Sequence, residues 1–404
     1  MYLKRNIIVL IALFPSMVYC QNINFKIDID TSKYIKSTRD FSGRLFVLTN
    51  SDTSQLALYW PNTADTQPAF AIDIKHFKPG HKVTIDEKAT KWMHSLDILE
   101  GYYSVSILLD IDATLDNLLA PGNLVSDKQV IKIEKGIKQT FELKIEYPIY
   151  PFPFTETDFV KEIKIKSKLL TDFYGVPTKI TGAVILPESY YEDMTKTYPI
   201  VYVFSGWEGN QFHVVMGDFN QKRYGMTGFG EEKIYIFMDQ QCRFGYHVFA
   251  NSDNNGPRDD SFIQEFIPIV EKKYRASSNR FLMGQSSGGW AALWLQIKYP
   301  DTFDGAWAAS PDPIDFRHFE SMGNMYDHMT NVYYEIDSTP KVHAREDGET
   351  IISNIDALSM ESVYGEGQQF GSFESVFSKR GDNGKPMQVF DRETGNVDTK
   401  ISEN

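Results

Sequence analysis

Apolar and polar side chains alternate along the first third of the chain. The alternation has a period of two at residues 25–29, 103–109 and 141–145. A period of two places every second side chain on the same face of a strand. Several such runs, separated by turns rich in Gly, Pro, Asn and Asp, predict an all-β sandwich over residues 21–147.

The pattern changes after a proline-rich stretch. Pro148, Pro151 and Pro153 each fix φ and remove a backbone donor, so residues 148–157 are predicted to form a stiff linker. Beyond the linker, short apolar runs predict strands at residues 180–186, 200–204, 234–238, 280–283 and 305–309. Helical patterns follow at residues 261–274 and 290–299. Strands that alternate with helices predict an α/β domain over residues 158–404, with a mostly parallel sheet and helices on both faces.

The last ninety or so residues lose this alternation. Met325, Met329 and Val332 suggest a short helix, and residues 387–390 suggest a strand. The sequence offers no further long apolar strand there. We therefore expect the α/β domain to be incomplete towards its C-terminal end.

The clearest chemical motif is Gly-Gln-Ser-Ser-Gly at residues 284–288. It stands between the predicted strand at 280–283 and the predicted helix at 290–299. Strand, G-x-S-x-G and helix in this order are typical of the nucleophile elbow of α/β hydrolases. The sharp turn has no room for side chains beside the serine, which explains Gly284 and Gly288. Ser286 is therefore the predicted nucleophile.

Composition narrows the class of protein. The chain has 404 residues, 42% of them hydrophobic, and a formal net charge of −13. That length and apolar content can support more than one core. The acidic balance argues against a nucleic-acid or anionic-membrane partner. Only two cysteines occur, Cys20 and Cys242, so a mature chain that begins at Gln21 has no intramolecular disulfide.

The first twenty residues are typical of a secretory signal. Lys4 and Arg5 precede an apolar run at residues 7–14, and a short segment then ends at Cys20. The apolar run is too short for a membrane-spanning helix. We therefore predict a signal peptide at residues 1–20, no membrane anchor, and a periplasmic or extracellular protein; an uncleaved N-terminal anchor is the alternative.

From about residue 186 onwards the sequence resembles a known family. The segments that carry the resemblance are residues 186–190, 198–202, 250–257, 263–268, 273–275, the elbow with Trp290, and residues 311–316. They are similar to the exported, enterochelin-esterase-like branch of the esterase D group of α/β hydrolases. The β-rich segment and the linker resemble the N-terminal extension in the same group.

The resemblance implies hydrolysis of a carboxylic ester through Ser286. It also implies that the backbone N–H of Ser287 is one oxyanion donor and that a second donor comes from the loop near Trp207. In this family an acid and a histidine follow on the loops after the last strands of the sheet, and the sequence has no clear counterpart of those loops.

The candidates for the acid and the base come from the segment that follows the predicted strand at 305–309. His318, Asp312 and Asp315 share the loop at that edge of the sheet, where a base for Ser286 is needed. The alternative is that all three are ordinary loop residues. His213 and His247 also lie on loops but precede the serine, against the chain order of the fold.

The sequence predicts no metal and no cofactor. The acidic stretch at residues 253–260 lacks the spacing of a calcium loop. The expected activity is that of an exported serine esterase acting on a small-molecule or carbohydrate-linked ester. The alternatives are a non-catalytic binding protein with a hydrolase fold, and a truncated, inactive esterase.

Overall fold

The structure is a computed structural model. It describes residues 22–37, 39–58, 67–92, 94–207, 209–214 and 231–402. The predicted signal peptide lies outside the described residues.

The strands before the linker form two sheets. In the smaller sheet, β1 (Ile23–Ile29) pairs in parallel with β9 (Gln139–Ile145) and antiparallel with β4 (Val83–Ile85). The larger sheet has the order β10 (Tyr147–Pro148), β7 (Leu124–Val125), β6 (Gly101–Asp110), β2 (Phe41–Asn50), β3 (Ala69–Phe77) and β5 (Thr90–Trp92), with β8 (Gln129–Ile133) also on β6. A 3₁₀ turn, η1 (Leu96–Ile98), precedes β6.

Alternating side chains from both sheets meet in one apolar cluster. Phe25 of β1, Val47 of β2, Ile107 of β6 and Leu143 of β9 are among its buried members. The period of two read from the sequence is confirmed for β1, β6 and β9. The cluster explains it, because every second side chain of these strands faces the other sheet.

The segment after the linker contains a six-stranded mixed sheet. Its order is β11 (Val160–Ser167), β12 (Thr178–Ile185), β14 (Ile234–Met238), β13 (Tyr198–Phe204), β17 (Ala276–Gln285) and β18 (Gly305–Ala309). The last four strands are parallel to one another, whereas β12 is antiparallel to both of its neighbours. The carboxyl ends of the parallel strands therefore meet at one edge of the sheet, where ligand sites of such sheets lie.

The helices of this segment pack on one face of the sheet. They are α1 (Lys168–Tyr174), α3 (Arg258–Ser261), a π turn (Phe262–Phe266), α4 (Ile267–Lys273) and α5 (Ser287–Lys298). Leu170 of α1, Val270 of α4 and Leu295 of α5 belong to the same buried cluster. On the other face, the partly buried Phe154 packs against the apolar side chains of the strands. Helices on both faces stay a prediction.

Short elements connect the strands of the sheet. These are η2 (Glu188–Tyr191), η3 (Gln211–Val214), β15 (Gln241–Cys242) and β16 (Gly245–Tyr246). After β18 come η5 (Phe316–His318), η6 (Glu320–Met322), β19 (Val342–Glu346), β20 (Glu349–Ser353), α6 (Asn354–Tyr364), α7 (Gln368–Phe377) and α8 (Thr399–Ser402).

Two sequence predictions in this last segment are wrong. Residues 325–332 form turns and bends rather than a helix, because their backbone groups bond across short loops such as Thr330 N–H to Asp327 O. Residues 387–390 form no strand; Phe390 makes only an isolated bridge to Val397.

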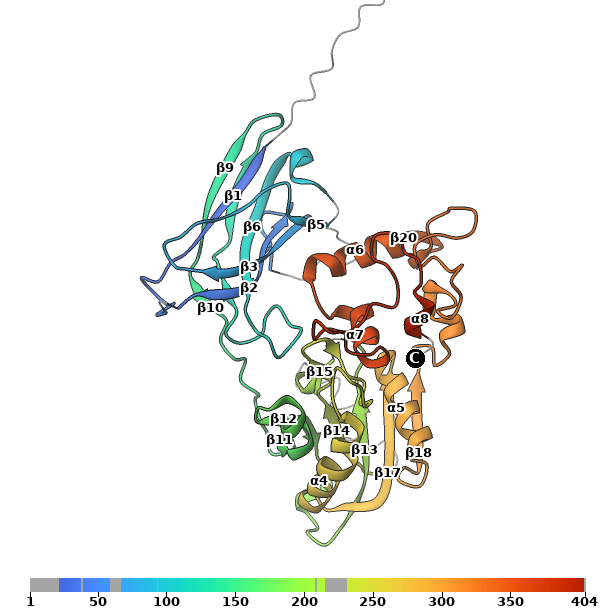
Figure 1. Cartoon of the computed structure of the whole chain (residues 1–404). Coiled ribbons are helices and arrows are strands. Elements are labelled where there is room, and N and C mark those ends of the chain that lie inside the picture. The colour runs from blue at the N-terminus through green and yellow to red at the C-terminus, as the bar shows by residue number, and fades with distance from the viewer. Residues whose placement is uncertain are drawn as a thin grey trace, which may run out of the picture.

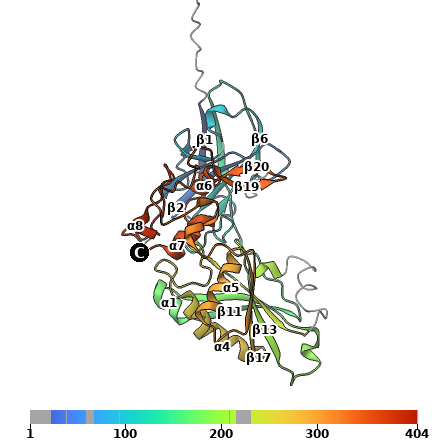
Figure 2. The same ribbon diagram turned by 90° about the vertical axis from the view of Figure 1, so that its right-hand side faces the viewer.

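Helix α6 covers the outer face of the larger N-terminal sheet. Its Val363 and Tyr364 lie in one buried cluster with Phe46 of β2 and Trp92 of β5. The Arg44 side chain of β2 donates to the carbonyl oxygen of Val363 at 2.7 Å. In Figures 1 and 2, α6 accordingly lies beside the blue and cyan strands, and α7 lies towards the α/β sheet.

This packing joins the C-terminal segment to the N-terminal one. The apolar outer face of the larger sheet is buried by a helix from the other end of the chain. The boundaries 21–147, 148–157 and 158–404, and a sandwich that folds on its own, stay predictions.

Candidate active site

Ser286 stands at the end of β17 in an unusual backbone conformation. Its φ is 56° and its ψ is −128°, a combination that residues with a side chain rarely adopt. Such a conformation costs about 1–3 kcal/mol and persists only where the surrounding structure enforces it. It lets β17 turn directly into α5, with the serine at the turn. This geometry matches the elbow that the sequence motif predicts.

The glycines of the motif are required by close backbone contacts. A Cβ atom on Gly284 would lie 2.0 Å from the carbonyl oxygen of Gly288. A Cβ atom on Gly288 would lie 2.1 Å from the carbonyl oxygen of Phe204, at the end of β13. The elbow is therefore packed backbone against backbone, and side chains at these positions would move Ser286.

The Ser286 hydroxyl bonds to a carboxylate. Its Oγ donates to Asp312 Oδ1 at 3.1 Å. Asp312 follows β18, and its backbone N–H donates to the Ser286 carbonyl oxygen at 3.3 Å. The Asp312 side chain is buried, and within the described part of the chain its second oxygen, Oδ2, has no hydrogen-bond partner. Burial raises the pKa of Asp312, and the bond from Ser286 opposes that shift.

The two predicted oxyanion donors lie beside the serine. Ser287 is the first residue of α5, where the backbone N–H groups are not used by the helix and the helix dipole favours negative charge. The Trp207 loop follows β13, and a Cβ on its Gly206 would lie 3.3 Å from Ser286 Cβ. Trp207 and Ser287 line the same small cavity. Both predicted donors are thus close to Ser286, just after the neighbouring strands β13 and β17.

The other predicted acid and base make no hydrogen bond to the serine hydroxyl within the described residues. Asp315 is bonded to Arg317, whose side chain lowers the pKa of Asp315 to about 2. His318 is exposed on η5. In the part of the chain that the structure describes, no histidine hydrogen-bonds Ser286 Oγ. The structure therefore brings together Ser286, Ser287, Trp207 and Asp312, but not Asp315 or His318.

The two histidines between the linker and Ser286 are His213 and His247. His247 is buried, and its Nδ1 accepts a hydrogen bond from the Phe249 N–H at 3.1 Å. Burial, with Arg258 nearby, holds the pKa of His247 well below its usual range. The backbone of His213 lies in η3, and its side chain lies outside the described residues.

Helix α7 covers the elbow, which sequence reasoning did not foresee. Its Phe373 and Val376 line the small cavity together with Trp207 and Ser287. Its Ser372 Oγ accepts from the Tyr246 N–H at 3.0 Å. Apolar residues at positions 370, 373 and 376–377 of the sequence have helical spacing and could have indicated this helix.

A second carboxyl group near Asp312 was also missed. Glu320 begins the turn η6, and burial raises its pKa to about 7, with the charge of Asp312 as the smaller cause. No sequence signal marks it, since its distance from Asp312 is set by the fold of the loop between them. It gives the site a carboxyl group that titrates near neutral pH.

The described residues contain neither a metal-binding cluster nor a membrane-spanning helix. No group of three or more His, Cys, Asp or Glu side chains there is arranged to hold a metal ion. No helix of that part is long and apolar enough to cross a membrane.

The mixed sheet, the elbow and the helix that follows it define an α/β-hydrolase fold. Residues 175–355, a little less than half of the chain, match the model of a family described as putative esterase. The matched segment contains the elbow and Asp312. The central segment of the chain therefore resembles the esterase group. No curated protein matches the chain significantly.

Solved structures of esterases also align with part of the chain. One is a ferulic acid esterase with 26% identity, covering 38% of this chain and 61% of that one at a TM-score of 0.32. Another is an S-formylglutathione hydrolase from Agrobacterium tumefaciens with 19% identity, covering 39% and 60% at 0.31. A third is a CE1 ferulic acid esterase from Anaeromyces mucronatus with 20% identity, covering 41% and 62% at 0.29. The chain spans about three fifths of the length of these structures.

Proposed function

We propose that the chain is a serine esterase that transfers an acyl group from a carboxylic ester to water through Ser286. The observation that carries the proposal is the Ser286 hydroxyl, held on a strained turn and bonded to the buried Asp312 at 3.1 Å. The match of residues 175–355 to the esterase family supports it independently.

In this proposal Asp312 takes the place of the usual histidine. Ser286 Oγ attacks the ester carbonyl carbon while its proton passes to the Asp312 carboxylate. The oxygen that becomes negative is held by the N–H groups of Ser287 and of the Trp207 loop. The bond to the alcohol oxygen then breaks, and the alcohol leaves with the proton from Asp312. Water then attacks the acyl carbonyl carbon while its proton passes to Asp312. The bond to Ser286 Oγ breaks, the carboxylic acid leaves, and Ser286 regains its proton from Asp312.

A carboxylate is a weaker base than imidazole, so the reaction is expected to be slow. The best proton acceptor has a pKa near the working pH, and burial moves the pKa of Asp312 in that direction. We expect turnover above the background of the oxyanion site alone, which is about 10³–10⁴-fold over water in serine hydrolases without a triad.

A second candidate is a non-catalytic binding protein with a hydrolase fold. It is favoured by one observation, that no histidine in the described ranges bonds the Ser286 hydroxyl. The two candidates differ in whether Ser286 is activated, since a serine without a working base reacts slowly with electrophiles.

Reaction with a fluorophosphonate probe separates the candidates. The esterase proposal predicts that the purified protein is labelled on Ser286, and that the Ser286→Ala variant is not. The same variant should lose nearly all hydrolysis of p-nitrophenyl acetate while its melting temperature stays close to that of the parent. A parent protein that is neither labelled nor active would support the binding protein instead.

Export of the protein is proposed on the sequence alone. If residues 1–20 are a cleaved signal, the mature protein recovered from the producing cells begins at Gln21 and lies outside the cytoplasm. N-terminal sequencing after cell fractionation tests this, and a cytoplasmic protein that retains Met1 would contradict it.

A further inference from the structure

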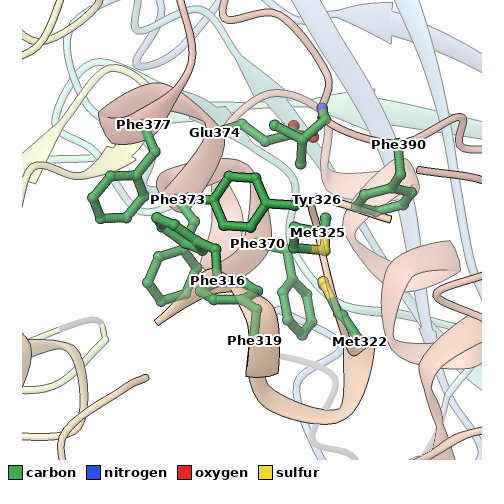
Figure 3. A pocket seen from close by; sticks show the side chains of 11 residues that line it. Phe316, Phe319, Met322, Met325, Tyr326, Phe370, Phe373, Glu374, Phe377 and Phe390 are labelled. Carbon is green, nitrogen blue, oxygen red and sulfur yellow. Dashed lines mark hydrogen bonds between the residues drawn. The ribbon is translucent and has the colours of Figure 1, made fainter. Parts of the chain in front are cut away.

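A second, larger pocket lies beside α7. It is lined by six phenylalanines, Tyr326, two methionines, one valine and Glu374, and its empty volume is about 710 Å³, counting the solvent at its mouth. The residues come from the segment after β18, from α7 and from residues 389–390. Figure 3 shows the rings and the methionine side chains around this space. Predominantly apolar and aromatic linings of this kind are typical of small-ligand sites.

The pocket adjoins the elbow through shared side chains. Phe373 lines both the pocket and the small cavity that contains Ser287. Phe377 lines the pocket and packs with its ring centroid 5.1 Å from that of Trp290, on the first turns of α5. Phe316, also in the lining, follows Asp312 by four residues. The pocket is therefore next to the serine and the carboxylate of the proposed site.

The lining offers a ligand apolar surface and no available charge. The one carboxylate, Glu374, is buried and bonded to Arg392 at 2.6 Å and to the N–H of Val389 at 2.9 Å. Its bonds are thus made within the protein. Phe319 and Phe373 meet edge to face at 4.9 Å, whereas Phe373 and Phe377 are stacked. The methionine side chains are flexible enough to adapt to a ligand.

We propose that this pocket binds an uncharged apolar group, several carbons long, of the ester substrate; the proposal rests on the proposed function of Ser286. Either the acyl or the alcohol side of the ester could carry that group, since the pocket recognises only its apolar surface. Charged groups are excluded because nothing in the lining replaces the water they would lose.

The first test compares esters of increasing length. In p-nitrophenyl esters the acyl chain grows from acetate to octanoate, and in alkyl acetates the alcohol grows from ethyl to octyl. A filled apolar pocket gains about fourfold in kcat/KM for each methylene that it buries. We expect a gain of at least about tenfold along one of the two series, and that series identifies the side of the ester that enters the pocket. Equal kcat/KM along both series would overturn the proposal.

Variants at the mouth of the pocket provide the matched comparison. Tyr326 lies in the lining and is 44% exposed, so Tyr326→Asp places a carboxylate at the entrance without burying it fully. We expect this change to reduce the ratio of long-chain to short-chain kcat/KM about tenfold or more. Met329, 77% exposed and outside the lining, is the control, and Met329→Asp should leave the ratio unchanged. Equal ratios in the two variants would contradict the proposal.

Binding without catalysis separates this proposal from that of the previous section. In the Ser286→Ala variant, the neutral dye Nile red should bind with increased fluorescence and be displaced by ethyl octanoate but not by ethyl acetate. Suppose that the fluorophosphonate labels Ser286 of the parent, but that kcat/KM is equal along both ester series and ethyl octanoate displaces the dye no better than ethyl acetate. The pocket proposal then fails and the esterase proposal stands. If ethyl octanoate displaces the dye but Ser286 is not labelled, the pocket holds an apolar group and the esterase proposal fails.

Discussion

At the scale of single residues, the elbow depends on glycines, which have no Cβ atom. Gly288 allows α5 to start against the end of β13, where a Cβ atom would meet the Phe204 carbonyl oxygen. We expect Gly288→Ala to lower the free energy of unfolding by about 3 kcal/mol or more, since backbone atoms cannot move aside as a flexible side chain can. Urea denaturation of the parent and the variant measures this difference in the free energy of unfolding.

Gly371 provides the control for that variant. It lies within α7, and nothing lies within 4 Å of where its Cβ would stand. Gly371→Ala should therefore be neutral or stabilise by up to about 1 kcal/mol, as expected for alanine in place of glycine in a helix. If Gly288→Ala is as stable as Gly371→Ala, the description of the elbow is wrong.

The second residue-scale prediction concerns the pH dependence of ester hydrolysis. Only the carboxylate form of Asp312 accepts the proton of Ser286, and burial raises the pKa of Asp312. The rate constant kcat/KM should therefore rise with pH through that raised pKa, and not through the ordinary range of an aspartate. Asp312→Asn should remove this rise and lower kcat/KM by about 10²–10⁴-fold.

Asp315→Asn is the matched control for Asp312→Asn. Asp315 is three residues away and its carboxylate bonds to Arg317, so its loss should change neither the rate nor its pH profile. A pH-rate profile that shifts with Asp315→Asn and not with Asp312→Asn would show that Asp312 is not the base. The pH-rate profiles of the three proteins, measured with one short ester, decide between the two.

At the scale of elements, helices α6 and α7 are held together by a buried acid. Glu361 of α6 accepts from the N–H of Phe370, in the first turn of α7, at 2.8 Å. Burial raises the pKa of Glu361 to about 8, with Arg392 opposing and Glu374 adding to the shift. The folded protein therefore keeps a proton on Glu361 that the unfolded chain releases above its ordinary pKa of 4.5.

The sign of the effect on stability follows from that difference. Between pH 4.5 and about 8 the folded state binds more protons than the unfolded state at this group, so the stability from Glu361 is complete below that window and is lost as the pH rises through it. The slope is at most about 1.4 kcal/mol per pH unit. Glu361→Gln should flatten this part of the stability curve measured by urea denaturation at several pH values. An unchanged slope would contradict the raised pKa.

The elements differ in how well the sequence predicted them. Strands β14 and β18 were predicted with the bounds that the structure gives, because each is a short apolar run between turns. Helix α7 was missed because its buried face includes Ser372, Glu374 and Ser375, which look like surface residues. These side chains bond to distant segments; Glu374, for example, bonds to Arg392. Only the folded chain supplies such partners.

The candidate site was predicted in the same uneven way. The G-x-S-x-G motif is local, so Ser286 and the N–H of Ser287 could be assigned from the sequence. The choice among Asp312, Asp315 and His318 could not, because three to six residues of loop separate them and its path decides which one meets the serine. That path depends on packing between segments far apart in the chain.

At the scale of the whole molecule, α6 connects the two ends of the chain. If the linker is cut, the burial of Val363 and Tyr364 against the larger N-terminal sheet should keep the pieces together. A specific protease site inserted between the exposed residues Thr155 and Glu156 allows the cut. We expect the two fragments to co-elute in gel filtration under native conditions.

Two variants of α6 test the cause of that association. Val363→Asp places a charge in the buried contact, which costs several kcal/mol, and should separate the fragments. Ser362→Asp, at the neighbouring exposed position, should not. Fragments that separate without any substitution would instead support two independent domains with boundaries at residues 148–157.

The contact between Arg44 and Val363 also sets the order of events during biosynthesis. The two residues are 319 positions apart, and a ribosome adds roughly 5–20 residues per second. The outer face of the larger sheet therefore stays uncovered for roughly 15–60 s, until α6 has been synthesised. During that time Phe46 and Trp92 contact water or a chaperone. Faster or slower translation of the second half of the gene, for example through synonymous codons, should then change the yield of native protein without changing a single residue.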